Sequence, residues 1–143
     1  MTEYKAPDLT LLGADHITRY QETGGEVGYL WNGVPTLLLT TTGRKSGEQR
    51  TRALIFGQDG DDYLVVASMG GAPRHPQWYL NLVATPAAEI QVRADHLPVT
   101  ARTAQSPDER ARLWKVMAGI WPNYDAYQAR TDREIPVVVL SRR

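Results

Sequence analysis

The chain has 143 residues, 16 of them basic and 16 acidic, so the formal net charge is zero and no overall field attracts nucleic acid. It contains no cysteine, which excludes disulfides, thiolate nucleophiles and thiolate metal ligands and suits a reducing, cytoplasmic compartment. Its apolar runs are too short to span a membrane, and residues 1–14 lack the pattern of a signal peptide. We therefore expect one cytoplasmic domain over residues 1–143, with a bulky ligand held in a surface groove or at the seam of a homodimer.

The N-terminal region, residues 1–25, predicts an amphipathic helix over Asp8–Thr23 that stops at Gly24-Gly25. The residues at helical spacing in this stretch are Leu9, Leu12, His16, Ile17 and Tyr20. Such a helix is also compatible with peripheral contact with a membrane surface.

Strand-like runs follow, separated by the turn residues Asn32-Gly33, Asp59-Gly60 and Ala94-Asp95. Short sequential strands with such turns indicate an antiparallel meander. The predicted strands are Val27–Trp31, Pro35–Thr42, Thr51–Phe56, Tyr63–Ser68, Ile90–Arg93 and Leu97–Thr103.

The C-terminal third predicts two helices and a last strand. Ser106 and Glu109 have the spacing of a capping box around Pro107 and open a helix that runs to about Gly119. A short helix over Tyr124–Arg130 and a buried strand over Ile135–Leu140 complete the chain. Seven strands with few helices favour a mainly β fold, a partly closed β-barrel, over a doubly wound sheet.

A basic, glycine-containing loop is the most concentrated positive site in the sequence. Residues 41–52 carry Arg44, Lys45, Arg50 and Arg52 against one acid. Glycines allow backbone N–H groups to converge on an anion, and the cations add charge-assisted hydrogen bonds, so the loop predicts a phosphorylated or carboxylate ligand. The alternative is a solvated hairpin turn. The glycine spacing matches neither a P-loop nor a dinucleotide fingerprint.

A second segment, residues 67–82, leaves a strand through Gly70-Gly71 and enters a helix near Pro76. The glycine pair allows close approach of the backbone to a flat ligand, and Trp78 offers an aromatic wall, so the segment suits a planar heterocycle. The alternative is that Trp78 packs the helix on the barrel and Asn81 is exposed.

Three blocks resemble the deazaflavin-dependent nitroreductase family of actinobacteria: Thr-Thr-Thr-Gly-Arg-Lys-Ser-Gly at 40–47, Ala-Ser-x-Gly-Gly-Ala-Pro-x-x-Pro-x-Trp-Tyr-x-Asn-Leu at 67–82, and Trp-Pro-x-Tyr-x-x-Tyr-Gln-x-Arg-Thr-x-Arg-x-Ile-Pro at 121–136. The resemblance covers about residues 26–141. It implies a split β-barrel related to flavin-binding, pyridoxamine-oxidase-like proteins, and it implies coenzyme F420 as the cofactor.

The resemblance also implies where this cofactor lies, with its phosphate and glutamyl tail on the basic loop and its ring on the second segment. The implied cofactor-binding residues are Arg44, Lys45, Ser46, Gly47, Arg50, Thr51, Arg52, Ala53, Leu54, Ile55, Val66, Ala67, Ser68, Met69, Gln77, Trp78 and Asn81. The implied acceptor pocket contains Met69, Trp121, Tyr124 and Tyr127. Members that activate nitroimidazole prodrugs have a lysine at position 69 and a tyrosine at position 121, so the resemblance argues against that activity here.

Candidate catalytic residues are Tyr124, Tyr127 and Ser68. The two tyrosines are three apart on a short helix, where their hydroxyls face one side and can donate a proton or hydrogen bond to an acceptor. The alternative is amphipathic packing with solvated hydroxyls. His16, His75 and His96 have no acidic partner at metal-ligand spacing, so we expect surface or helix-cap histidines and no metal site.

The resulting hypothesis is an enzyme that binds reduced F420 and transfers its hydride to a quinone, an enone or a nitroaromatic compound. The cofactor provides the chemistry and the protein provides the geometry. The rival hypothesis is a non-catalytic carrier of a deazaflavin, a flavin or haem, which the same residues would serve.

Overall fold

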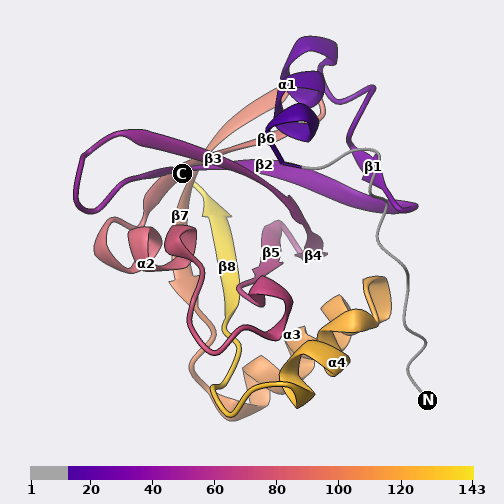
Figure 1. Cartoon of the computed structure of the whole chain (residues 1–143), viewed down its shortest axis with the longest axis vertical. Coiled ribbons are helices and arrows are strands. Elements are labelled where there is room, and N and C mark those ends of the chain that lie inside the picture. Colours follow the sequence, from indigo (N-terminus) through magenta and orange to yellow (C-terminus); the bar gives the residue numbers. More distant parts are fainter. Residues whose placement is uncertain (1–12) are drawn as a thin grey trace.

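Eight antiparallel strands form one curled sheet, a half-barrel with short helices around it, in the computed structural model, which describes residues 13–143 (Figure 1). The sheet order is β1-β2-β6-β7-β8-β5-β4, and β3 pairs with β2. The strands are β1 Leu30–Trp31, β2 Val34–Thr42, β3 Gln49–Ile55, β4 Gly57–Asp59, β5 Asp62–Val66, β6 Ala87–Val92, β7 Asp95–Thr103 and β8 Val137–Arg142. The helices are α1 Gly13–Thr23, the 3-10 helix η1 Met69–Gly71, α2 Gln77–Ala84, α3 Pro107–Ile120 and α4 Asn123–Ala129.

The central strands are buried on both faces, which explains the uninterrupted apolar sequence of β8. Val138 and Leu140 point into one core cluster, inside the half-barrel with Trp78. Val137 and Val139 point into the other cluster, beneath α3 and α4. Because successive side chains of a strand point to opposite faces, only a continuous apolar run can fill both layers.

The β2–β3 hairpin carries the basic loop away from the barrel. Its register runs from Thr36 opposite Ile55 to Thr42 opposite Gln49, so residues 43–48 form the tip. The helix α2 packs beside this hairpin, against β2 and β7. This packing brings the basic loop and the second sequence segment together.

The helix α1 is fixed on the sheet by one buried tyrosine. The hydroxyl of Tyr20 donates to the carbonyl of Thr36 at 3.0 Å and accepts from the backbone N–H of Arg93 at 2.9 Å. His16 and Tyr20 turn inward, and the opposite face of α1 is exposed and polar. Among residues 13–143, no helix is long and apolar enough to cross a membrane.

The predicted element order is confirmed, with corrections. Residues 8–12 of the predicted first helix lie outside the described residues. The strand predicted over Val27–Trp31 was too long, since only Leu30–Trp31 pairs. The backbone turns at Gly28, at φ +103°, where its carbonyl accepts from His16 and from the Thr36 hydroxyl instead of joining a ladder.

Other details differ from the prediction as well. The strand predicted over Ile90–Arg93 begins three residues earlier and is β6, Ala87–Val92. The strand β4 was not predicted, because it is short and begins with a glycine, Gly57. The glycine is needed there because α3 crosses β4 so closely that a Cβ at position 57 would lie 2.7 Å from the sulfur of Met117. The capping box is half formed: the Ser106 hydroxyl accepts from the N–H of Glu109. The carboxylate of Glu109 instead accepts two hydrogen bonds from Arg102, at 2.8 and 3.0 Å.

Candidate functional site

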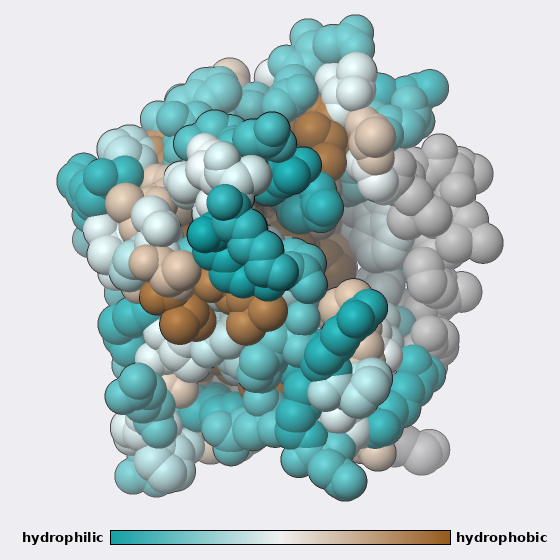
Figure 2. Space-filling view, turned by 60° about the vertical axis from the view of Figure 1, so that its left-hand side comes forward, coloured by the Kyte–Doolittle hydropathy of each residue, from teal (hydrophilic) through white to brown (hydrophobic). Residues whose placement is uncertain are grey.

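Two adjoining cavities lie where β3, α2 and the η1 loop meet. The larger has a volume of about 490 Å³ and the smaller about 300 Å³, and Arg52, Gln77 and Trp78 line both. These volumes match those of small-molecule sites in proteins. In Figure 2, hydrophilic residues border recesses in which hydrophobic surface shows. The arrangement suits an elongated ligand whose two ends differ in polarity.

The smaller, basic cavity is organised by Arg44. Its guanidinium donates to the amide oxygens of two α2 residues, Asn81 at 2.9 Å and Gln77 at 2.8 Å. Its backbone N–H donates to Asn81 Oδ1 at 3.2 Å, and Asn81 Nδ2 donates to the Thr41 hydroxyl at 3.3 Å. Arg44 is thus held in position before any ligand binds.

The other cations of the loop are held less firmly. Arg50 forms an exposed ion pair with Glu48 at 3.2 Å, and Arg52 donates to the carbonyl of Thr51 at 2.9 Å. Within the described residues, the ammonium group of Lys45 makes no hydrogen bond or ion pair. With one acid against four cations, the cavity favours an anion.

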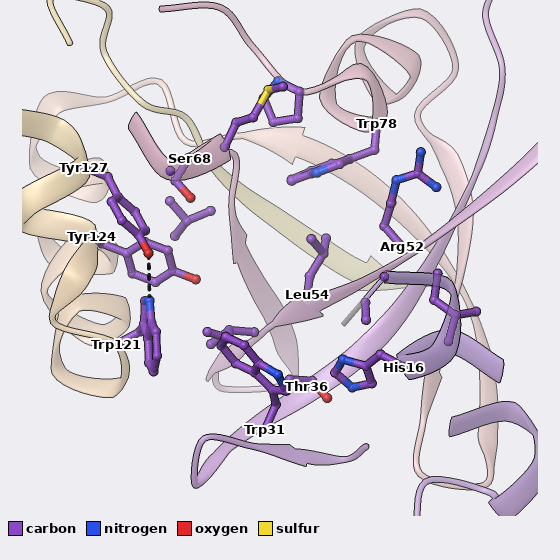
Figure 3. A pocket seen from close by; sticks show the side chains of 18 of the residues that line it. His16, Trp31, Thr36, Arg52, Leu54, Ser68, Trp78, Trp121, Tyr124 and Tyr127 are labelled. Carbon is purple, nitrogen blue, oxygen red and sulfur yellow. Dashed lines mark hydrogen bonds between the residues drawn. The ribbon is translucent and has the colours of Figure 1, made fainter. Parts of the chain in front are cut away.

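The larger cavity has aromatic and aliphatic walls (Figure 3). The indole of Trp78 projects into it from α2, and Leu54 on β3 points toward that indole. Tyr124, Tyr127 and Ser68 line one side. A slot between a buried indole and an aliphatic side chain suits a flat heterocycle.

Tyr124 and Tyr127 reach the cavity from α4, with ring centroids 6.1 Å apart. Burial, with a smaller contribution from Tyr127, raises the pKa of Tyr124 well above its usual range, so the hydroxyl remains protonated. The Tyr127 hydroxyl accepts from Trp121 Nε1 at 3.5 Å. Among residues 13–143 no hydrogen-bond partner of the Tyr124 hydroxyl is present, so it is available to a ligand.

The η1 loop forms the rim between the tyrosines and Trp78. Met69, Gly70 and Gly71 all have positive φ, of 47°, 65° and 83°. A Cβ on Gly71 would lie 2.5 Å from the carbonyl oxygen of Tyr127, so the loop touches the backbone of α4. Met69 is exposed and Ser68 is buried at the cavity wall.

The structure brings most of the predicted site residues together. The basic cavity is lined by Arg44, Lys45, Ser46, Arg50 and Asn81, and the larger one by Ala53, Leu54, Ile55, Val66, Ser68, Met69, Trp121, Tyr124 and Tyr127, with Arg52, Gln77 and Trp78 common to both. Gly47, Thr51 and Ala67 line neither; the Thr51 hydroxyl bonds to that of Thr40 at 2.8 Å. Asn81 lies with the basic loop and not at the aromatic cavity, because Arg44 occupies its amide oxygen.

Gly70, whose backbone was expected to approach the ligand, also lines the larger cavity. Other residues that line it were not predicted: Gly13, His16, Ile17, Trp31, Thr36 and Pro76. His16 was expected at the surface or at a helix cap but is buried, and its Nε2 donates to the carbonyl of Gly28 at 2.8 Å. The signal was its place on the inward stripe of the first helix. In the described part of the chain, no three His, Cys, Asp or Glu side chains cluster as metal ligands do.

The proteins similar to this chain in sequence are named after their cofactor. A family model described as F420H(2)-dependent quinone reductase matches residues 14–142. An F420H(2)-dependent quinone reductase of Mycobacterium tuberculosis (strain ATCC 25618 / H37Rv) is 48% identical over 131 residues, which are 90% of this chain and 88% of that protein.

Solved structures are similar as well. One described as an F420-H2 dependent reductase (FDR-A) has a TM-score of 0.69 and 42% identity, covering 75% of this chain and 94% of that one. One described as a domain-swapped dimer has a TM-score of 0.73 and 38% identity, covering 89% and 92%.

The expected relation to pyridoxamine-oxidase-like proteins is confirmed at the level of the fold. A structure described as a putative pyridoxamine 5'-phosphate oxidase from Listeria innocua has a TM-score of 0.53 at 11% identity, covering 75% of this chain and 82% of that one. The half-barrel is therefore of the split-barrel type. By the match over residues 14–142 and the identity to the mycobacterial protein, the chain belongs to the F420H(2)-dependent quinone reductase family.

Proposed function

We propose that this protein is a reductase that binds reduced coenzyme F420 and delivers its hydride to a quinone. The observation that carries the proposal is the pair of joined cavities, basic at one end and aromatic at the other, with Arg52, Gln77 and Trp78 in common. The cofactor has the same division, an anionic phosphate and glutamyl tail joined to a flat ring. The family's F420 dependence agrees with this fit.

Each end of the cofactor has residues that fit it. Arg44, Lys45, Ser46 and Arg50 would hold the phosphate and the tail through charge-assisted hydrogen bonds. Trp78 and Leu54 would pack against the ring, and backbone groups of residues 66–69 would form hydrogen bonds with its edge. When bound, the reduced deazaflavin supplies a hydride and so acts as the two-electron donor that the protein itself lacks.

The acceptor would occupy the remaining aromatic part of the larger cavity. Trp121, Tyr127 and Met69 line it, and Trp31 lies against Trp121 with ring centroids 5.5 Å apart. Such walls suit a planar quinone. A quinone that gains a hydride also gains a proton, and Tyr124 presents a protonated hydroxyl without a partner among the described residues. Its role is to donate a hydrogen bond or proton to the acceptor oxygen; Tyr127 and Ser68 are the other candidate donors.

One experiment tests cofactor and activity together. Fluorescence titration should give tighter binding of F420 than of NADPH, since the loop lacks a dinucleotide fingerprint. Mixing the reduced cofactor, enzyme and a soluble quinone should restore the absorbance of the oxidised deazaflavin, and omitting the quinone should abolish this change. Tighter binding of NADPH would refute the cofactor. Binding of F420 without quinone-dependent oxidation would favour the rival hypothesis of a carrier.

We also propose a homodimer, which is supported by the similar structure described as a domain-swapped dimer and by the exposed side chains of Leu30 in β1 and of Val27 shortly before it. Light scattering during size-exclusion chromatography would decide it, and a monomer at micromolar concentration would refute it. The cytoplasmic location and contact of residues 1–25 with a membrane stay predictions.

A further inference from the structure

The η1 loop, which forms one rim of the larger cavity, holds one residue in a backbone conformation that side chains disfavour. Positive φ at Met69 is costly for a residue with a side chain, whereas the two glycines that follow adopt positive φ readily. Such backbone persists only where its surroundings over-determine it. The question is which group does so.

One arginine from outside the loop binds it at several points. Arg133, four residues after α4 ends, donates from Nε to the carbonyl of Ala72 at 2.8 Å and from Nη2 to the carbonyl of Ser68 at 2.8 Å. Its Nη1 lies 3.3 Å from the carbonyl of Ala67 and 3.0 Å from Nδ1 of His75. The planar guanidinium thereby spans both ends of the loop, a geometry that a lysine ammonium cannot reproduce.

The arginine is itself anchored to α4, the helix that carries Tyr124 and Tyr127. The Gln128 side chain donates to the carbonyl of Arg133 at 2.8 Å and accepts from the N–H of Ile135 at 2.9 Å. Within residues 13–143, Arg133 pairs with no carboxylate, and its partners are neutral oxygens and an imidazole nitrogen. Its position therefore serves the loop and not an ion pair.

We propose that Arg133 is a positioning residue, which holds the Met69–Gly71 loop in register with α4 and so fixes the distance between the ring-binding backbone and Tyr124. This inference rests on the proposed function, because it assigns that backbone to the cofactor ring. Arg133 contacts neither cavity itself and acts through the loop.

The test compares Arg133→Met, Arg133→Lys and the control Arg143→Met. Arg143 is a matched control because its guanidinium also donates to two backbone carbonyls, of Val99 at 3.1 Å and of Ala88 at 3.2 Å, away from both cavities. Hydrogen exchange of the protein without cofactor is the first readout, because the N–H groups of Gly71 and Ala72 are hydrogen-bonded within the loop. The second readout is the affinity for oxidised F420, and the third is kcat against KM.

Arg133→Met should speed exchange of these two amides by about tenfold or more, the equivalent of one charged hydrogen bond, while exchange in β8 is unchanged. In Arg133→Met, cofactor affinity should fall only severalfold, because the basic cavity is intact, and kcat should fall by a larger factor. The exchange rates, affinity and kcat of Arg133→Lys should lie between those of Arg133→Met and the wild type. Unchanged loop exchange in folded Arg133→Met, or equal effects of Arg143→Met, would overturn the proposal. If Arg133→Met does not fold, Arg133→Lys decides it by the same readouts. If the wild type does not bind F420, the proposed function fails, and the exchange readout still decides the role of Arg133.

Discussion

Replacing Arg44 and Lys45 of the basic loop one at a time should show that the arginine, whose side chain is held in place, contributes more to F420 affinity than the lysine, whose side chain is not. Arg44 is held by Asn81 and Gln77 through hydrogen bonds of 2.9 and 2.8 Å, so an anion that binds it orders little additional side chain. A charged hydrogen bond is worth about 1.5–3 kcal/mol, so Arg44→Ala should weaken F420 binding about 10- to 150-fold. Ordering a free lysine side chain costs up to about 2 kcal/mol, which offsets most of the gain at Lys45, so Lys45→Ala should cost less than about tenfold.

Fluorescence titration with F420 measures these affinities, and three comparisons sharpen the result. Arg112→Ala is the charge control, because Arg112 pairs with Asp59 and lines neither cavity. Asn81→Leu keeps every charge but frees Arg44, so it should weaken binding by a smaller factor than Arg44→Ala. In 1 M salt, where the screening length falls to about 3 Å, the effect of Lys45→Ala should shrink. Unchanged affinity in a folded Arg44→Ala/Lys45→Ala double variant would refute the assignment of the anionic tail to this loop.

Three further predictions concern the tyrosine side, the η1 loop and His75. Tyr124→Phe should lower kcat by about tenfold or more with each quinone tested and leave the thermal midpoint almost unchanged, because the hydroxyl has no partner among the described residues; full activity would make Tyr124 a packing residue. Gly71→Ala should reduce the free energy of unfolding in urea by about 1–3 kcal/mol, because the new Cβ would meet the Tyr127 carbonyl at 2.5 Å and φ is +83°; wild-type stability would contradict the close approach. Burial, and to a smaller extent the charge of Arg133, lowers the pKa of His75 below 6.5, so the folded protein favours the neutral imidazole. The contribution of His75 to the free energy of unfolding is therefore complete above pH 6.5 and is lost as the pH falls through the pKa of the folded state. His75→Gln should flatten this part of the curve of stability against pH, and an unaltered curve would contradict the prediction.

The elements were predictable where local signals and packing agree. The turn at Asn32-Gly33 and the helix after Ser106-Pro107 are confirmed, because both depend on backbone preferences of the residues themselves. The short β4 and the shortened β1 were not predictable, since contacts distant in sequence decide them: α3 over Gly57, and α1 against Gly28.

The candidate site divides in the same way. Two blocks of sequence indicated the basic loop and the aromatic wall, and α2 brings them together. The hydrogen bonds of Asn81 and Gln77 to Arg44 were not predictable, because they depend on how α2 packs against the hairpin. His16 was assigned to the surface because a lone histidine on a helical stripe does not reveal that its ring meets a turn twelve residues away.

The two cavities share Arg52, Gln77 and Trp78, but the aromatic wall of the larger one comes from other parts of the chain, and this separation bears on how such a protein changes over generations. The residues of the basic cavity come from the β2–β3 hairpin and α2, whereas Trp31, Trp121 and Tyr127 come from β1, the end of α3 and α4. Under the proposed function, substitutions in the second group would change the shape of the acceptor pocket and leave the residues that bind the charged tail unchanged. Selection for a new oxidant could then act on the acceptor pocket alone, and these three aromatic positions are the ones to vary in directed evolution of substrate range.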